Sequence, residues 1–180
     1  MRDDMGKITK EAFSSEVVSI LINIIVGLLL TLLLLPRASF SQLIIMVPAM
    51  LSARGNISGS YSARVARDLI IGSARKNLPE NVLSTVTLML VTSVVIGFIS
   101  SWIAFLLHET FLPVHYFFLL PLMTMGMTSA VSIPTSTSLN ILAFKKGLNP
   151  SNVVPPIMTS IDDVLIVLNL FVAITILGVP

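Results

Sequence analysis

Two adjacent carboxylates, Asp162 and Asp163, interrupt an otherwise apolar stretch that extends from Val153 to the end of the chain. A carboxylate at membrane depth is costly unless it has a partner, a proton, water or an ion. Arg54, in a second largely apolar stretch, is one available partner. Because consecutive helical residues point about 100° apart, a single cation serves both carboxylates poorly. We therefore expect one aspartate to pair with Arg54 and the other to face a water-filled path.

The spacing of polar residues leaves open which aspartate faces that path. Thr159 and Asn169 fall on the same helical side as Asp162, and this polar stripe favours Asp162. Thr159 and Ser160 also stand close to Asp163 along the helix. Periodicity alone does not choose between the two carboxylates.

The available side chains suit a hard cation. The chain has no cysteine, so thiolate ligands and disulfides are excluded. We interpret its two histidines, His108 and His115, as ordinary residues of a predicted loop rather than as a soft-metal entry site. Oxygen ligands are typical of Mg²⁺ and Ca²⁺ sites. The metal-ligand set predicted here is Asp163, Asp162, Asn56, Ser160 and Thr159.

Asn56 lies between two glycines, Gly55 and Gly59, in the second apolar stretch. Gly55 and Gly59 are four residues apart, the spacing of close helix packing in membranes. They open room for another helix or for an ion, and both interpretations place this helix in the interior of the protein.

The composition indicates which elements position these residues. Of the 180 residues, 54% are hydrophobic and 11% are charged, whereas soluble domains carry about 25% charged residues. A soluble domain is thereby excluded, and the length fits about five or six membrane-spanning helices of about 20 residues each. The formal charge of +2 reflects basic residues in loops, and no nucleic-acid partner is expected.

The hydropathy pattern predicts an all-α integral membrane protein with five transmembrane helices. A short polar segment, residues 1–16, precedes them and is expected in the cytoplasm. Residues 52–61 are polar, but a span that ended at Leu51 would be too short to cross a bilayer. We therefore expect residues 52–61 to lie at membrane depth as well. Basic residues near 64–76 and 145–146 place the N-terminus inside and the C-terminus outside. The predicted spans are 17–35, 42–61, 82–107, 116–144 and 153–180.

Three stretches carry a family resemblance. Residues 47–56 read VPAMLSARGN, residues 145–153 read KKGLNPSNV, and residues 160–164 read SIDDV. They resemble segments of the MgtE-type magnesium transporters, and more closely those of the eukaryotic solute-carrier relatives of that family. The resemblance implies that residues 17–180 form an MgtE-like five-helix transmembrane domain and that Asp163 is the last-helix aspartate of the cation path.

Two departures from the family pattern shape our expectations. Family channels carry large regulatory domains before the membrane part, whereas 16 residues precede it here, so gating by cytoplasmic magnesium is not expected. Asp162 also stands where the family usually has Ser or Gly. The solute-carrier relatives join two five-helix halves in one chain, so a single half implies a two-fold homodimer with the path on its axis.

The function predicted from the sequence is transport of a divalent cation, with Mg²⁺ first, by a multi-pass protein of the cell membrane. The expected partners are a second copy of the chain, the lipid bilayer and the cation, with no cofactor. Both a channel and a cation-coupled exchanger fit these features. Less favoured alternatives are a metal-dependent lipid-headgroup enzyme and a non-transporting membrane subunit, since an enzyme usually spreads its carboxylates over two helices.

Overall fold

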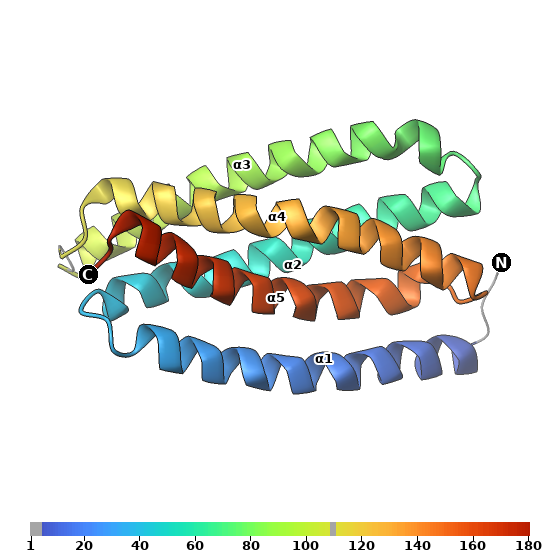
Figure 1. Ribbon diagram of the computed structural model, residues 1–180, viewed down its shortest axis with the longest axis horizontal. Coiled ribbons are helices and arrows are strands. Elements are labelled where there is room, and N and C mark those ends of the chain that lie inside the picture. The colour runs from blue at the N-terminus through green and yellow to red at the C-terminus, as the bar shows by residue number, and fades with distance from the viewer. Residues whose placement is uncertain (1–4, 109–110) are drawn as a thin grey trace.

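Five long helices make up the protein. A computed structural model describes residues 5–108 and 111–180; residues 109–110 of the predicted loop and residues 1–4 lie outside the described part. The helices are α1 (Met5–Leu34), α2 (Phe40–Ile70), α3 (Ala74–Leu106), α4 (Val114–Lys145) and α5 (Pro150–Leu177). They alternate in direction, so that α1 begins at one end of the bundle and α5 finishes at the other (Figure 1). The predicted all-α architecture with five helices is confirmed.

The helix boundaries follow local signals that partly differ from those predicted. Asn149 caps α5, because its side chain accepts a hydrogen bond from the Ser151 backbone N–H at 3.1 Å, and Pro150 takes the first helical position. Helix α5 therefore begins at Pro150, before the start of the predicted span 153–180. Helix α3 begins well before Pro79, which lies inside it. At the α2–α3 turn, Gly72 has a φ of 76°, a left-handed conformation that glycine adopts without strain.

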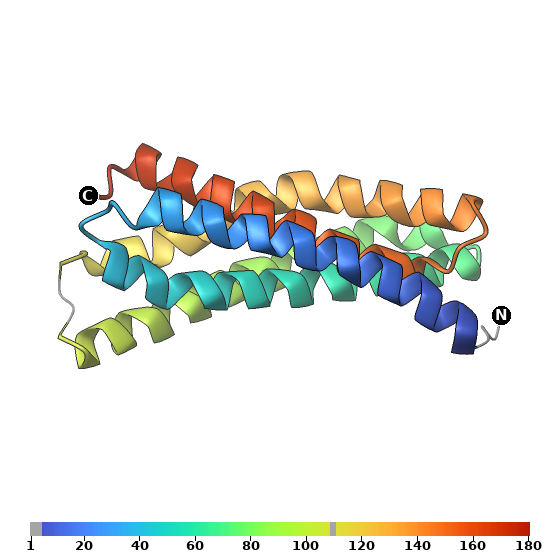
Figure 2. The ribbon, with the colours of Figure 1, turned by 90° about the horizontal axis from the view of Figure 1, so that it is seen from below.

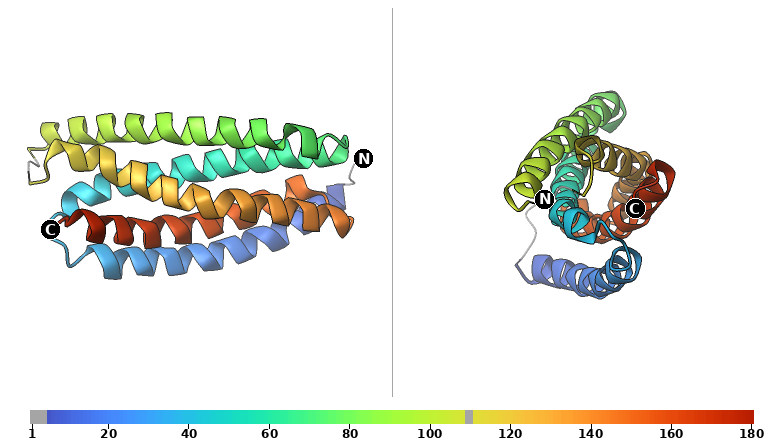
Figure 3. Two further views of the ribbon diagram at one scale, coloured as in Figure 1. Left: turned by 45° about the horizontal axis from the view of Figure 1, so that its top comes forward. Right: turned by 90° about the vertical axis from the view of Figure 1, so that its left-hand side faces the viewer.

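Three helices pack against one another at the centre of the bundle. Helices α2, α4 and α5 contact each other pairwise, α3 packs on α2 and α4, and α1 lies along α5. Figure 3 shows α1 and α3 at opposite edges, with α2 between them, and in Figure 2, seen from below, α1 crosses in front of the other helices. At Gly97 of α3, a Cβ would lie 2.7 Å from the Phe117 carbonyl oxygen. Helices α3 and α4 therefore approach so closely that a side chain larger than glycine does not fit.

Four helices are long and apolar enough to cross a membrane: residues 16–34 of α1, and all of α3, α4 and α5. Helix α2 is also long, with 31 residues, or about 46 Å at 1.5 Å per residue. Its second half is polar, and it is not among the four. The sequence prediction of five spans is thus supported for four helices, and the span within α2 stays a prediction.

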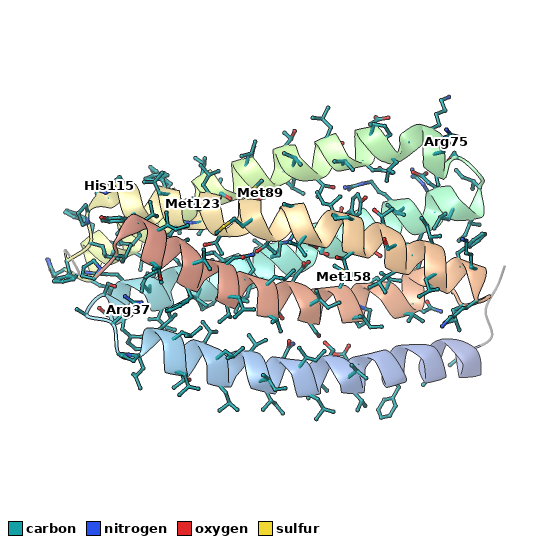
Figure 4. The ribbon with its side chains drawn as sticks, viewed as in Figure 1. Arg37, Arg75, Met89, His115, Met123 and Met158 are labelled. Atoms are coloured by element: carbon teal, nitrogen blue, oxygen red, sulfur yellow. The ribbon has the colours of Figure 1, made fainter. Side chains whose placement is uncertain are left out.

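The charged ends of the bundle differ. Arg75 lies at the α2–α3 turn, at the end of the molecule away from Arg37 and His115 (Figure 4). The end of α4, whose last turn carries Lys145, lies at the same end of the bundle as the α2–α3 turn (Figure 1). The basic residues of these turns therefore gather at one end of the helices.

Candidate cation site

Asp162 lies in the interior, paired with Arg54. The Arg54 Nε atom is 3.5 Å from Asp162 Oδ2, and the two side chains are 1% and 0% exposed. The Arg54 Nη1 group donates a hydrogen bond of 3.1 Å to Ser129 Oγ. A single arginine from α2 thus connects α5 to α4, and the ion pair expected for one of the two aspartates is present on Asp162.

Two further hydroxyls complete this buried cluster. Ser58 of α2 and Ser132 of α4 lie beside the Asp162 carboxylate. Neither hydroxyl, and neither carboxylate oxygen of Asp162, forms a hydrogen bond with the described part of the chain. We call the five residues Arg54, Ser58, Ser129, Ser132 and Asp162 the polar core. It contains a balanced charge pair with incomplete hydrogen bonding.

Asp163 faces a different place, a surface hollow between α2 and α5. The hollow has a volume of about 350 Å³. It is lined by Leu51, Ser52, Gly55, Asn56, Thr159 and Asp163. Asp163 forms no ion pair or hydrogen bond with residues in the described ranges, and Asn56 is exposed. The carboxylate and the amide therefore face the same open space with their oxygen atoms available.

Both residues stand at the middle of their helices. Asp163 is 13 residues from the start of the 28-residue α5, which is about 20 Å along a helix of about 42 Å. Asn56 is 16 residues from the start of the 31-residue α2. Helices of these lengths exceed the roughly 30 Å hydrocarbon core of a bilayer, and α5 is one of the four helices apolar enough to cross it.

Gly55 allows the two helices to meet at the hollow. A Cβ at this position would be 3.2 Å from Thr159 Cγ2, whereas a Cβ at Gly59 would meet nothing within 4 Å. Gly55 therefore packs closely on α5, as the first interpretation requires, and also borders the hollow. That it leaves room for an ion stays a prediction. Gly59 has no such contact within the chain.

The residues of the predicted metal-ligand set separate into two places. Asp163, Asn56 and Thr159 line the hollow. Asp162 lies in the polar core, and Ser160 is buried against α1, where it shares a hydrogen bond with Ser19. The structure thus brings three of the five residues together.

The polar stripe that favoured Asp162 has another explanation. Asn169 donates a hydrogen bond of 3.0 Å to Thr128 of α4, and Asp162 is beside Ser132 of the same helix. Asp162 and Asn169 therefore face the polar middle of α4, whereas Thr159, the third residue of the stripe, lines the hollow. Similar bonds tie α4 to α2, where Tyr61 and Thr137 share a hydrogen bond of 2.6 Å and Asn140 donates to Ser62 at 3.0 Å.

Sequence reasoning missed two features of this region. The hydrogen bond from Arg54 to Ser129 was not predicted. The many hydroxyl residues in the middle of α4 do indicate that this helix packs against other helices. The contact of Ser160 with α1 was also missed, because Ser19 is a lone hydroxyl in an apolar stretch.

The chemistry of the hollow is that of a site rich in neutral oxygen ligands. Among the side chains that the structure describes, no group of three or more His, Cys, Asp or Glu residues is placed to hold a metal ion. A cation at the hollow would therefore meet one carboxylate per chain, together with amide, hydroxyl and water oxygens. Such a ligand set suits a hard cation that keeps part of its hydration shell.

Comparison with known proteins is consistent with this arrangement. The chain matches the family model of MgtE, a divalent cation transporter, over residues 47–173. That range includes Arg54, Asn56 and both aspartates. Comparisons with curated proteins and with solved structures give no match. Since the family model covers more than two thirds of a chain in which four of the described helices are apolar enough to span a membrane, the protein is a multi-pass membrane protein that belongs to the MgtE family of divalent cation transporters.

Proposed function

We propose that this protein carries divalent cations, Mg²⁺ foremost, through a path that Asp163 and Asn56 line at the axis of a homodimer. The observation that carries the proposal is the hollow, where a carboxylate without a partner in the described chain meets an exposed amide at mid-helix. Family membership supports transport of a divalent cation. The choice of Mg²⁺, the axis and the residues are our inference.

The size and chemistry of the hollow favour a partly hydrated ion. A single buried water needs about 10–15 Å³ of such space, and the hollow has about 350 Å³. Mg²⁺ gives up its waters reluctantly and is usually held by one or two carboxylates with several waters retained. One carboxylate from each of two chains would supply that number.

The outer face of α2 supports pairing of two copies. Ser52, Asn56 and Ser60 are spaced four residues apart and are all exposed on the single chain. Polar side chains at membrane depth are not satisfied by lipid. A second copy related by a two-fold axis would cover this stripe with the same stripe. The two Asp163 carboxylates would then approach each other, and a divalent cation between them would relieve their repulsion.

The charge distribution supports one orientation. Arg75 and Lys145 lie at the same end of the bundle (Figures 1 and 4). Because cytoplasmic loops are rich in Lys and Arg, this end would face the cytoplasm. The start of α1 would then be inside and the end of α5 outside.

Ion uptake into proteoliposomes tests the proposed function. With a Mg²⁺-sensitive dye inside, we expect Asp163→Asn to lose nearly all Mg²⁺ uptake. Glu80→Gln, which removes the same charge from an exposed position on α3, should keep wild-type uptake. Uptake by Asp163→Asn at the wild-type rate would refute the path. Repeating the assay with and without a Na⁺ or H⁺ gradient separates a channel from an exchanger, because only an exchanger needs the second ion.

The close approach at Gly55 gives a finer test of the hollow. In Gly55→Ala, the new Cβ would press on Thr159 Cγ2 at 3.2 Å and push α5 from α2 beside Asp163. We expect a severalfold loss of uptake with an intact fold. Gly126→Ala is the matched control, because a Cβ there meets nothing within 4 Å. Equal uptake by the two variants would show that the hollow is not part of the path.

Cross-linking tests the homodimer directly. The native chain has no cysteine, so a single introduced thiol reports only on its own position. Oxidation of Ser52→Cys in membranes should give a cross-linked dimer, whereas Val131→Cys on the exposed apolar face of α4 should stay monomeric. Absence of a dimer band for Ser52→Cys with normal thiol labelling would contradict an axis along this stripe.

A further inference from the structure

Arg54 connects the polar core with the hollow. It directly precedes Gly55 and Asn56, which line the hollow, and its guanidinium pairs with Asp162 at 3.5 Å. Asp162 in turn directly precedes Asp163. Three charges therefore lie within two adjacent segments of α2 and α5, and two of them cancel.

The cancellation depends on a charge that cannot be removed by titration. Arginine stays protonated in proteins, so its positive charge persists whether or not a carboxylate balances it. With Asp162 ionised, the pair is neutral and Asp163 gives the hollow one negative charge per chain. Without Asp162, the arginine would offset Asp163 and leave the hollow with no net charge.

The build of the pair argues against a purely stabilising role. Replacing a buried ion pair by apolar residues is often neutral or stabilising. Here neither carboxylate oxygen of Asp162 accepts a hydrogen bond from the described residues, and the Arg54 Nε group donates none to them. What the pair does supply is a fixed balance of charge beside Asp163.

We propose that Arg54 is a specificity-determining residue of the cation path: held by Ser129 and balanced by Asp162, its guanidinium sets the hollow at one negative charge per chain. Two chains then present two negative charges, which match one divalent cation. This inference rests on the proposed function, and it adds a residue that does not touch the ion.

Titration calorimetry of Mg²⁺ on the purified full-length protein tests the charge balance. Asp162→Asn leaves an unbalanced positive charge near Asp163, so we expect the apparent Mg²⁺ affinity to fall roughly tenfold or more. In Arg54→Gln/Asp162→Asn both charges are gone and the hollow regains its net charge. The double variant should therefore return to within about threefold of wild-type affinity. Glu80→Gln is the charge-matched control and should bind like wild type.

A stability measurement on the same samples separates this role from a structural one. Thermal unfolding should show both variants less stable than wild type, whereas only Asp162→Asn binds Mg²⁺ weakly. Wild-type affinity in folded Asp162→Asn, or equal weakness in the single and double variants, would overturn the proposal.

A variant that removes the positive charge instead of the negative one tests the proposal if Asp162→Asn does not fold. Arg54→Gln leaves a second carboxylate unbalanced, so the Mg²⁺ affinity should rise above that of wild type. An unchanged affinity would overturn the proposal. The proposed function fails separately, if Asp163→Asn binds Mg²⁺ as wild type does.

Discussion

Asp68 and Asp162 are both buried, at 1% and 0% exposed, yet their surroundings differ in kind. Asp68 Oδ2 accepts a hydrogen bond from Asn81 at 2.8 Å. Its Oδ1 accepts from Asn77 at 3.2 Å, and Arg67 and Ser73 also donate to it. Asp162 has an arginine 3.5 Å away and accepts no hydrogen bond from the described chain.

The difference reflects position along α2 and α5. Asp68 lies in the last turn of α2, where the chain reverses and donors from α3 come within reach. It therefore joins the two helices. Asp162 lies at mid-helix, where backbone donors are used within helices and only side chains of neighbouring helices are available. Asp68 is held by several side-chain hydrogen bonds, whereas Asp162 is held mainly by the charge of Arg54, with the Ser58 and Ser132 hydroxyls beside it.

The largest effect is expected from removing the charge partner in the polar core. Asp162→Ala leaves Arg54 buried and unpaired, and breaking a buried pair in this way costs about 3–5 kcal/mol. Unfolding in mixed micelles with increasing SDS measures the loss. Arg54→Met/Asp162→Ala, which removes both charges, should recover most of it. A double variant no more stable than the single one would show that charge imbalance is not the cause.

A smaller and more local effect is expected from removing the carboxylate of Asp68. Asp68→Ala removes an acceptor that four side chains share, but Arg67 is 66% exposed and the donors lie near the end of the bundle, where water replaces the lost bonds. Hydrogen exchange should therefore increase over residues 68–81 and stay unchanged over residues 155–170. Faster exchange across both regions would mean that Asp68 supports the whole bundle and would remove the contrast with Asp162.

Ser129 tests how far the polar core depends on hydrogen bonding. In Ser129→Ala the Arg54 Nη1 group loses its 3.1 Å acceptor, while the charge pair stays. A hydrogen bond to a charged group contributes about 1.5–3 kcal/mol, so the SDS midpoint should shift less than in Asp162→Ala. A loss as large as that of Asp162→Ala would show that the hydroxyl, rather than the carboxylate, holds the arginine.

The adjacent pair Asp162 and Asp163 shows what could be predicted from the sequence. The number and class of helices follow from apolar runs, and the pairing of one aspartate with Arg54 follows from the scarcity of intramembrane charge. Periodicity does not show which of Asp162 and Asp163 faces the hollow. The middle of α4 is itself polar, and Asp162 and Asn169 pack against it. Family resemblance pointed to Asp163 because it compares whole segments rather than one helix face.

Contacts that depend on how the helices pack could not be predicted from the sequence. Ser160 was predicted beside Asp163 in the ligand set, but it faces α1, where it meets Ser19. The hydrogen bonds of Asp68 with Asn77 and Asn81 were not predicted. Both outcomes depend on which helix becomes a neighbour and at what rotation, and short-range spacing carries little information on either.

The smallest expected effect is a response to acid at Asp68, beyond the part of α2 expected in the membrane. Burial raises the pKa of this carboxyl, but hydrogen bonds from Asn81, Asn77 and Arg67 outweigh it, so the pKa lies below its ordinary value of 3.8. A lowered pKa means that the folded state favours the ionised form, so the stabilisation is complete above that ordinary value and is lost as the pH falls through the folded pKa. Hydrogen exchange of the α2–α3 turn should therefore stay constant from pH 7 to pH 5, after correction for the intrinsic rate, and increase below about pH 4. Asp68→Asn has no proton to gain and should show no such increase. If the turn loosens between pH 7 and pH 5, another group controls it, and the well-bonded aspartate is not the reason that this end of the bundle holds together.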